Sequence, residues 1–108
     1  MNTENAKAQM RKGTLEFCIL AIVKQKDCYA SDIISTMKEK NLIVVEGTLY
    51  PLLTRLKNSG LLQYRWEESR QGPPRKYYEL TQDGKAYLTE LENSWKELVE
   101  SINSIISQ

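Results

Sequence analysis

Hydrophobic residues recur at helical spacing through the first part of the chain. Residues 14–24 are apolar almost all round, and with the helix-compatible residues 4–12 before them they predict one long helix or a pair kinked at Gly13. Between residues 29 and 40 the apolar positions follow i, i+3, i+4, i+7, which predicts an amphipathic helix that Asn41 can end. The four apolar residues 42–45 are long enough only for a short strand.

The same spacing returns in four leucines between residues 46 and 59. Pro51 is compatible only with the start of a helix, because an interior proline removes a hydrogen bond and clashes with the preceding turn. This helix is therefore expected to start close to residues 46–48. Gly60 is suited to the left-handed conformation that ends a helix.

Two aromatic-rich segments follow, in which apolar and polar residues alternate. Residues 61–68 and 75–80 predict short strands, and residues 69–74 (SRQGPP) predict a turn without helix or strand. Together they predict a hairpin with a Gly-Pro loop.

The last segment predicts one long helix with Thr81 as its N-cap. Its apolar residues step by three and four, the spacing of a heptad seam, which Val99 and Ile106 widen. Too little chain remains to cover this seam, so we expect a second copy of the protein to cover it in a homodimer. The predicted dimerisation residues are Leu88, Leu91, Trp95, Leu98, Ile102 and Ile105.

The composition restricts the classes of function. The chain has 108 residues, of which 41% are hydrophobic and 27% charged, as expected for one globular domain. No apolar run approaches the roughly 20 residues of a membrane helix, and residues 1–12 do not resemble a secretory signal, so a cytoplasmic protein without membrane contact is expected. The chain has no histidine, and Cys18 and Cys28 lie outside any CxxC spacing and are interpreted as structural. We therefore expect no catalytic triad, no metal, no cofactor and no enzyme.

Charge is distributed unevenly. Residues 1–80 carry 13 basic and 9 acidic side chains, and residues 81–108 carry 2 and 5. A basic body indicates an anionic partner, although chance variation over a short chain explains the asymmetry equally well.

The order of elements is that of a winged helix-turn-helix. The predicted fold is mainly α (α+β), with a DNA-binding domain over residues 1–80 and a C-terminal dimerisation helix over residues 81–108. The exposed face of the 46–59 helix is expected to enter the DNA major groove, with an ordinary solvated helix face as the alternative. Its candidate DNA-binding residues are Thr48, Tyr50, Pro51, Thr54, Arg55 and Lys57.

The hairpin adds a second candidate DNA contact. Arg70, Gln71, Arg75 and Lys76 surround the Gly-Pro loop, and such a stiff, basic tip is typical of a wing that reaches phosphates or the minor groove. A charged surface turn has the same composition. The two features in this chain order are more specific than either alone.

The chain resembles the PadR-type bacterial transcriptional regulators. The resemblance covers roughly residues 10–98 and is carried by the strings GTLEFCILAIV (13–23), EGTLYPLLTRLKNSGLL (46–62), GPPRKYYELTQDG (72–84) and ENSW (92–95). It implies a dimeric winged-helix repressor that binds double-stranded DNA. The C-terminal helix, aided by the N-terminal one, would form the dimer. It also implies that Thr48, Leu49, Tyr50 and Pro51 start the recognition helix and that residues 72–76 form the wing.

The sequence has two features that distinguish it from the usual family pattern. Ala30 stands where the family usually has glycine after a tyrosine, and only one helix follows Thr81, as in the short-tailed subgroup. Some members respond to phenolic acids or bind drug-like molecules between subunits. The resemblance therefore makes a small aromatic effector beside Trp95 a candidate ligand, and a bulky residue that only fills the dimer seam is the alternative.

Three classes of function can be distinguished: a DNA-binding repressor, a protein-binding module and an enzyme. A repressor of an inverted-repeat operator uses every feature above. A winged-helix protein that contacts only other proteins would not need Tyr50, Thr54 or the basic hairpin. An enzyme would need a catalytic set that the sequence does not contain. A mobility-shift assay on the DNA upstream of the gene separates the first two.

Overall fold

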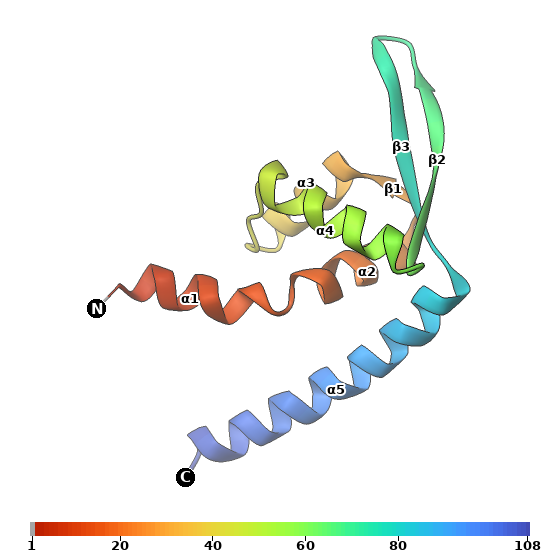
Figure 1. Cartoon of the computed structure of the whole chain (residues 1–108). Helices are drawn as coiled ribbons and strands as arrows, with labels where there is room; N and C mark the ends of the chain where they lie inside the picture. Colours follow the sequence, from red (N-terminus) through yellow and green to blue (C-terminus); the bar gives the residue numbers. More distant parts are fainter. Residues whose placement is uncertain (1) are drawn as a thin grey trace.

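The computed structural model describes residues 2–108 (Figure 1) and contains, within that range, five helices and one three-stranded sheet. Met1, the first residue of the predicted DNA-binding domain, lies outside the described residues. In chain order the elements are α1 (Thr3–Lys12), α2 (Leu15–Gln25), β1 (Cys28–Tyr29), α3 (Ala30–Glu39), α4 (Glu46–Asn58), β2 (Leu62–Ser69), β3 (Gly72–Leu80) and α5 (Gln82–Ile106). The predicted mainly α winged-helix fold is confirmed.

The N-terminal helices form the kinked pair. Between α1 and α2 the Thr14 hydroxyl donates a 2.7 Å hydrogen bond to the Arg11 carbonyl, which closes the last turn of α1 at Gly13. No residue of α1 is buried. Helix α2 contributes Ile19, Leu20 and Val23 to the core. Its other apolar residues are partly buried against that core, which is why the sequence is apolar nearly all round: Leu15, Phe17, Cys18, Ala21 and Ile22.

Residues 42–45 do not form the predicted strand. Both ends of this segment are used as helix caps instead: the Leu42 N–H donates to the Met37 carbonyl at the end of α3, and the Val45 carbonyl accepts the first bonds of α4. Asn41 adopts a left-handed conformation (φ 63°) at the end of α3, as its position predicts. The segment is a short connection between two helices, held by the buried side chain of Val44.

The sheet contains a strand that sequence analysis did not predict. Strand β1 pairs with β3, with Cys28 opposite Tyr78 and Tyr29 opposite Tyr77, so that β3 lies in the centre of an antiparallel sheet of order β1-β3-β2. The sequence pattern assigned Tyr29 to the following helix. Two residues are too few to show the alternation of apolar and polar side chains that predicts a strand. Cys28 and Tyr29 form a strand because they pair with β3.

The hairpin is longer than predicted. Residues 72–74 were expected in the turn, but they belong to β3, and Arg70 and Gln71 alone separate the strands. Strand pairing runs from Leu62 opposite Leu80 to Ser69 opposite Gly72, with an irregularity between Glu67 and Ser69. Pro73 and Pro74 lie opposite this irregularity on the partner strand. The N–H groups that they lack would therefore fall where the hydrogen-bond ladder is already interrupted.

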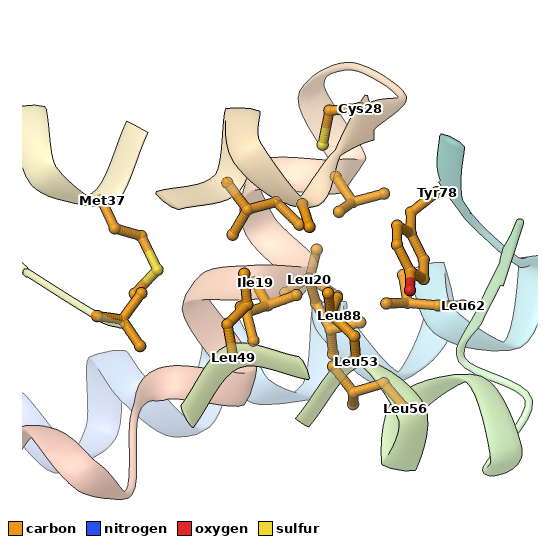
Figure 2. Packing of buried hydrophobic residues seen from close by; sticks show 14 residues of the cluster. Ile19, Leu20, Cys28, Met37, Leu49, Leu53, Leu56, Leu62, Tyr78 and Leu88 are labelled. Atoms are coloured by element: carbon orange, nitrogen blue, oxygen red, sulfur yellow. The ribbon is translucent and has the colours of Figure 1, made fainter. Parts of the chain in front are cut away.

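One core joins the helices to the base of the hairpin. Figure 2 shows Leu49, Leu53 and Leu56 of α4 facing Leu62 and other residues from the surrounding elements. The buried members are Ile19, Leu20, Val23, Cys28, Ala30, Ile33, Met37, Val44, Leu49, Leu53, Leu56, Leu62, Tyr78 and Leu88. The leucine stripe predicted for α4 is therefore its buried face.

The start of α5 is fixed against the base of the hairpin. Thr81 caps the helix as predicted, accepting from the Gly84 N–H at 2.9 Å, and its hydroxyl donates to the Gly60 carbonyl at 2.6 Å. A Cβ atom at Gly84 would clash with the Leu61 carbonyl oxygen, so this close approach requires glycine. The remainder of α5 extends away from the hairpin toward the side of the molecule where α1 lies (Figure 1).

Candidate nucleic-acid interface

Helix α4 presents all its predicted DNA-binding residues to solvent. The side chains opposite the leucine stripe are exposed: Thr48, Tyr50, Pro51, Thr54, Arg55 and Lys57. Pro51 lies in the second turn, where it removes the donor to the Gly47 carbonyl, and Gly47 is itself exposed to water. The arrangement gives a helix with one apolar face and one face of hydroxyls and cations, as a recognition helix requires.

One of these cations has a partner within the chain. Arg55 Nη2 lies 2.6 Å from Glu16 Oε1 of α2. Lys57 has no ion pair among the residues that the structure describes. The charge of Arg55 is therefore partly neutralised by Glu16, whereas the charge of Lys57 is not.

The wing cations are not gathered at the tip. Arg70 and Gln71 form the turn, whereas Arg75 and Lys76 lie several residues away on β3. Neighbouring residues of a strand point to opposite faces, so these two side chains leave the strand in opposite directions. The basic tip expected from the sequence is in fact spread along one strand.

The structure holds Arg75 in place from two sides. Its guanidinium carbon lies 3.8 Å from the centre of the Tyr29 ring, and its Nη2 donates a 2.6 Å hydrogen bond to the Ser31 hydroxyl. Ser31 is 44 residues distant in the chain, so no sequence pattern linked the two. These two contacts fix the direction in which the guanidinium points.

A groove of about 430 Å³ lies between α4, the predicted recognition helix, and the β2–β3 hairpin. Tyr50 of α4 and Lys76 of β3 line it, with the start of α3 closing another side. Arg75 leaves β3 on the other face but reaches Ser31 at the start of α3, and so borders the groove as well. The structure thus brings part of the two predicted patches together, which the sequence could only place on separate elements. Arg70, Gln71, Thr54 and Lys57 do not line this groove.

The outer face of the sheet is electrostatically different. Arg65 donates to Glu67 at 2.8 Å and also contacts Glu79 and Asp27. The hydrogen bond with Glu67, followed by the charges of Glu67, Glu79 and Asp27, raises the pKa of Arg65. This cation is surrounded by carboxylates, so the part of the face around Arg65 has little attraction for phosphates.

The seam of α5 is divided along its length. Leu88 is fully buried in the core of its own chain and Leu91 is half-buried against it. Trp95 lies 6.2 Å from Phe17 between ring centres and is 44% exposed. Leu98, Ile102 and Ile105 are 50%, 44% and 67% exposed. The part of the seam available to a second chain therefore begins at about Trp95.

The cysteines are not joined to each other, and the pKa of each thiol is raised. Both are free thiols, and burial, followed by the nearby charges of Asp32 and Asp27, raises the pKa of Cys28 to about 11. Burial also raises the pKa of Cys18. Over residues 2–108 no group of three histidine, cysteine or acidic residues is placed to hold a metal ion, and no helix is long and apolar enough to cross a membrane.

Solved structures share this architecture over nearly the whole chain. A PadR-like transcription factor from Bacteroides fragilis is 64% identical, with a TM-score of 0.80, 94% of this chain covered and 98% of that chain. A PadR family transcriptional regulator from Eggerthella lenta is 28% identical, with a TM-score of 0.89 and coverage of 96% and 91%. An uncharacterised protein of Lysinibacillus sphaericus is 35% identical, covering 85% of this chain and 87% of that protein.

The family assignment agrees with these relatives. Residues 19–90 match the model of the transcriptional regulator PadR-like family. Regulators of this family bind DNA and are not enzymes, which agrees with the exposed face of α4 and the wing beside it. The chain belongs to the PadR-like family of transcriptional regulators.

Proposed function

We propose that the chain acts in the cytoplasm as a homodimeric repressor of an inverted-repeat operator and that a small aromatic effector releases it. Residues 1–80 would bind DNA and residues 81–108 would dimerise. The observation that carries the proposal is the exposed apolar side of α5, where Trp95, Leu98, Ile102 and Ile105 face solvent. Such a continuous apolar surface is typical of a protein interface.

A dimer would place two recognition helices on one duplex. Each α4 would enter the major groove with Thr48, Tyr50 and Thr54 directed at bases, while the cations contact the backbone. Because the dimer is two-fold, its half-sites should lie about 10 base pairs apart or a multiple of that spacing.

Base reading can be tested on α4. Tyr50→Phe and Thr54→Val each remove a hydroxyl from an exposed side chain, so stability should change little. Operator preference should change by about 1–3 kcal/mol for each base that is no longer read. Lys57→Gln is the matched control, because a cation that binds only phosphate strengthens binding to all sequences alike. Mobility shifts on the DNA upstream of the gene measure both effects.

The result also separates this function from a protein-only winged helix. A chain that binds only proteins would shift no duplex, even at low salt. Unchanged preference in both α4 variants would leave a DNA-binding protein whose sequence reading lies elsewhere.

The effector site is proposed at Trp95. One side of its indole packs on Phe17, and the remaining surface is exposed where a second chain would meet it. A flat aromatic compound could stack between two such indoles. Its binding would release DNA only if the compound has a higher affinity for a dimer in which the spacing of the two α4 helices no longer matches the operator half-sites.

Fluorescence tests the effector. In Trp66→Phe, Trp95 is the remaining tryptophan, so planar compounds that bind there should quench the emission. The same compounds should release the operator from the unmodified protein. If no quenching compound does so, Trp95 only fills the seam.

A further inference from the structure

Trp66 has an unusual position for a large aromatic residue of a small domain. It lies opposite Lys76 in the β2–β3 ladder and is 60% exposed, so the core does not account for it. Its indole lines the groove between the wing and α4, together with Tyr50. The hairpin that carries it projects beyond the helices (Figure 1).

Its neighbours hold the indole and a cation together. The ring of Tyr64 meets the ring of Trp66 edge-on, with centres 5.7 Å apart and planes at 87°. Lys76 Nζ lies 4.7 Å from the centre of the Tyr64 ring and 5.6 Å from that of Trp66. The wing therefore presents a flat apolar surface with an ammonium group beside it.

The charges of the groove indicate what would occupy it. Arg75 and Lys76 supply two cations, against the single carboxylate that Glu46 contributes to the described lining. A flat π surface beside cations is the combination that binds nucleic-acid strands without regard to sequence. A strand that passes between a recognition helix and its wing offers sugars to the indole and phosphates to the cations.

We infer that Trp66 is a DNA-contacting residue, whose indole packs against the sugar-phosphate strand lying between α4 and the wing. This inference rests on the proposed DNA-binding function. The contact does not depend on base identity, so it should strengthen binding to every duplex. An indole carries no charge and releases no counterion, so it should add affinity without adding to the salt dependence.

The first experiment follows tryptophan emission while a duplex of mixed sequence is added at low salt, where binding needs no operator. The unmodified protein should show a change in emission on binding. Trp66→Phe, in which Trp95 still emits, should lose that change. An identical change in both proteins would overturn the inference.

The second experiment measures affinity. Trp66→Ala should weaken binding several-fold, because the apolar surface of the indole would no longer cover the strand. Its salt slope should equal that of the unmodified protein. Gln63→Ala is the matched control: it removes an exposed side chain from the same strand, on the face where Gln63 bonds Glu79, and should bind normally.

A double-mutant cycle separates a contact from a positioning role. If Trp66 only holds Lys76, then Trp66→Ala should have no effect in a Lys76→Gln background, and the inference would be wrong. If the indole itself touches DNA, a loss of affinity should persist there. Lys76→Gln alone should make the log–log salt slope shallower by about 0.9 for each phosphate that Lys76 neutralises.

Two controls distinguish a folding defect from a loss of DNA contact, and the inference from the proposed function. Because Trp66 is mostly exposed, its variants should unfold at nearly the same temperature as the unmodified protein. Equal affinity in a folded Trp66→Ala variant would overturn this inference and leave the proposed function standing. Failure of the unmodified protein to bind any duplex at low salt would instead overturn the proposed function.

Discussion

The guanidinium of Arg55 is held by the carboxylate of Glu16, with 2.6 Å between Nη2 and Oε1. This contact joins the predicted recognition helix α4 to α2. The Arg55 side chain remains 71% exposed, whereas that of Glu16 is 24% exposed. An ion pair with so exposed a partner contributes little to stability, so a DNA phosphate can compete with Glu16 for the same cation.

Replacing Glu16 by Gln should therefore tighten DNA binding. The change removes a negative charge near the interface and leaves Arg55 free for phosphate, so affinity should rise several-fold. The log–log salt slope should steepen by up to about 0.9 for each additional phosphate neutralised. Stability should fall by less than about 1 kcal/mol. Binding titrations at several salt concentrations give both quantities.

The control for Glu16→Gln is the same change in an Arg55→Gln background. There the gain in affinity should be mostly abolished, because the freed cation is absent. A weaker-binding Glu16→Gln protein that is still folded would show that the pair orients Arg55 for DNA instead of competing with it.

Arg75 tests the wing. If Arg55, Lys57, Arg75 and Lys76 each neutralise one phosphate, a dimer contacts about 8 phosphates and the log–log slope is about −7. Arg75→Ala should weaken binding to all sequences alike and make the slope shallower by about 2 for a dimer. An unchanged slope would remove Arg75 from the DNA interface.

Ser31→Ala provides a finer test of the same side chain. It removes the hydroxyl that accepts from Arg75 and leaves the charge in place. The salt slope should stay unchanged, and affinity should fall only slightly, because Tyr29 still holds the guanidinium. A loss of affinity as large as that of Arg75→Ala would show that the hydrogen bond, not the charge, is what matters.

Leu98→Glu should dissociate the dimer. Leu98 is 50% exposed in the chain by itself, and burying a large apolar side chain against a partner contributes about 1.5–3 kcal/mol. A carboxylate there would have to be buried without a partner, so the dimer should be lost together with operator binding. Analytical ultracentrifugation and mobility shifts measure the two outcomes.

Asn93→Glu is the matched control on the same helix. Asn93 is exposed and lies about 140° around the helix from Leu98. It adds the same charge and should leave the dimer and the operator complex intact. Operator binding by a monomeric Leu98→Glu protein at normal affinity would contradict the proposed dimer.

The raised pKa of Cys28 makes stability depend on pH in alkaline solution. Its pKa moves from an ordinary value of 9.0 to about 11 in the folded chain. Well below pH 9 the thiol is protonated in both states and contributes no pH dependence. Between about 9 and 11 only the unfolded chain loses the proton, so the free energy of unfolding should fall with pH, by about 2 to 3 kcal/mol in all.

Urea unfolding at several pH values measures this dependence in the native protein and in Cys28→Ala. The variant should be less stable by a constant amount, because it leaves a small cavity, and its alkaline decline should be less steep. Tyr78, whose pKa burial also raises, is present in both proteins and cancels in the difference. Parallel curves would show that Cys28 ionises normally.

Local sequence patterns were sufficient to predict the helices and the family. The leucine stripe of α4, the Thr81 cap and the left-handed Gly60 are local features, since each depends on residues within a turn or two. The exposed face of α4 followed from the buried one. For the same reason its candidate DNA-binding residues could be identified without a structure.

Features that depend on contacts between distant segments could not be predicted from local patterns. Strand β1 exists because β3 lies beside it, and β3 begins at Gly72 because Ser69 of β2 pairs with that residue. Arg55 forms an ion pair with Glu16, and Arg75 donates a hydrogen bond to Ser31, although the partners are far apart in the sequence. Leu88 is buried in the core of its own chain and not in a dimer seam. The physical reason is the same in each case. A local pattern shows which face of an element is apolar, but the fold brings that face to its partner.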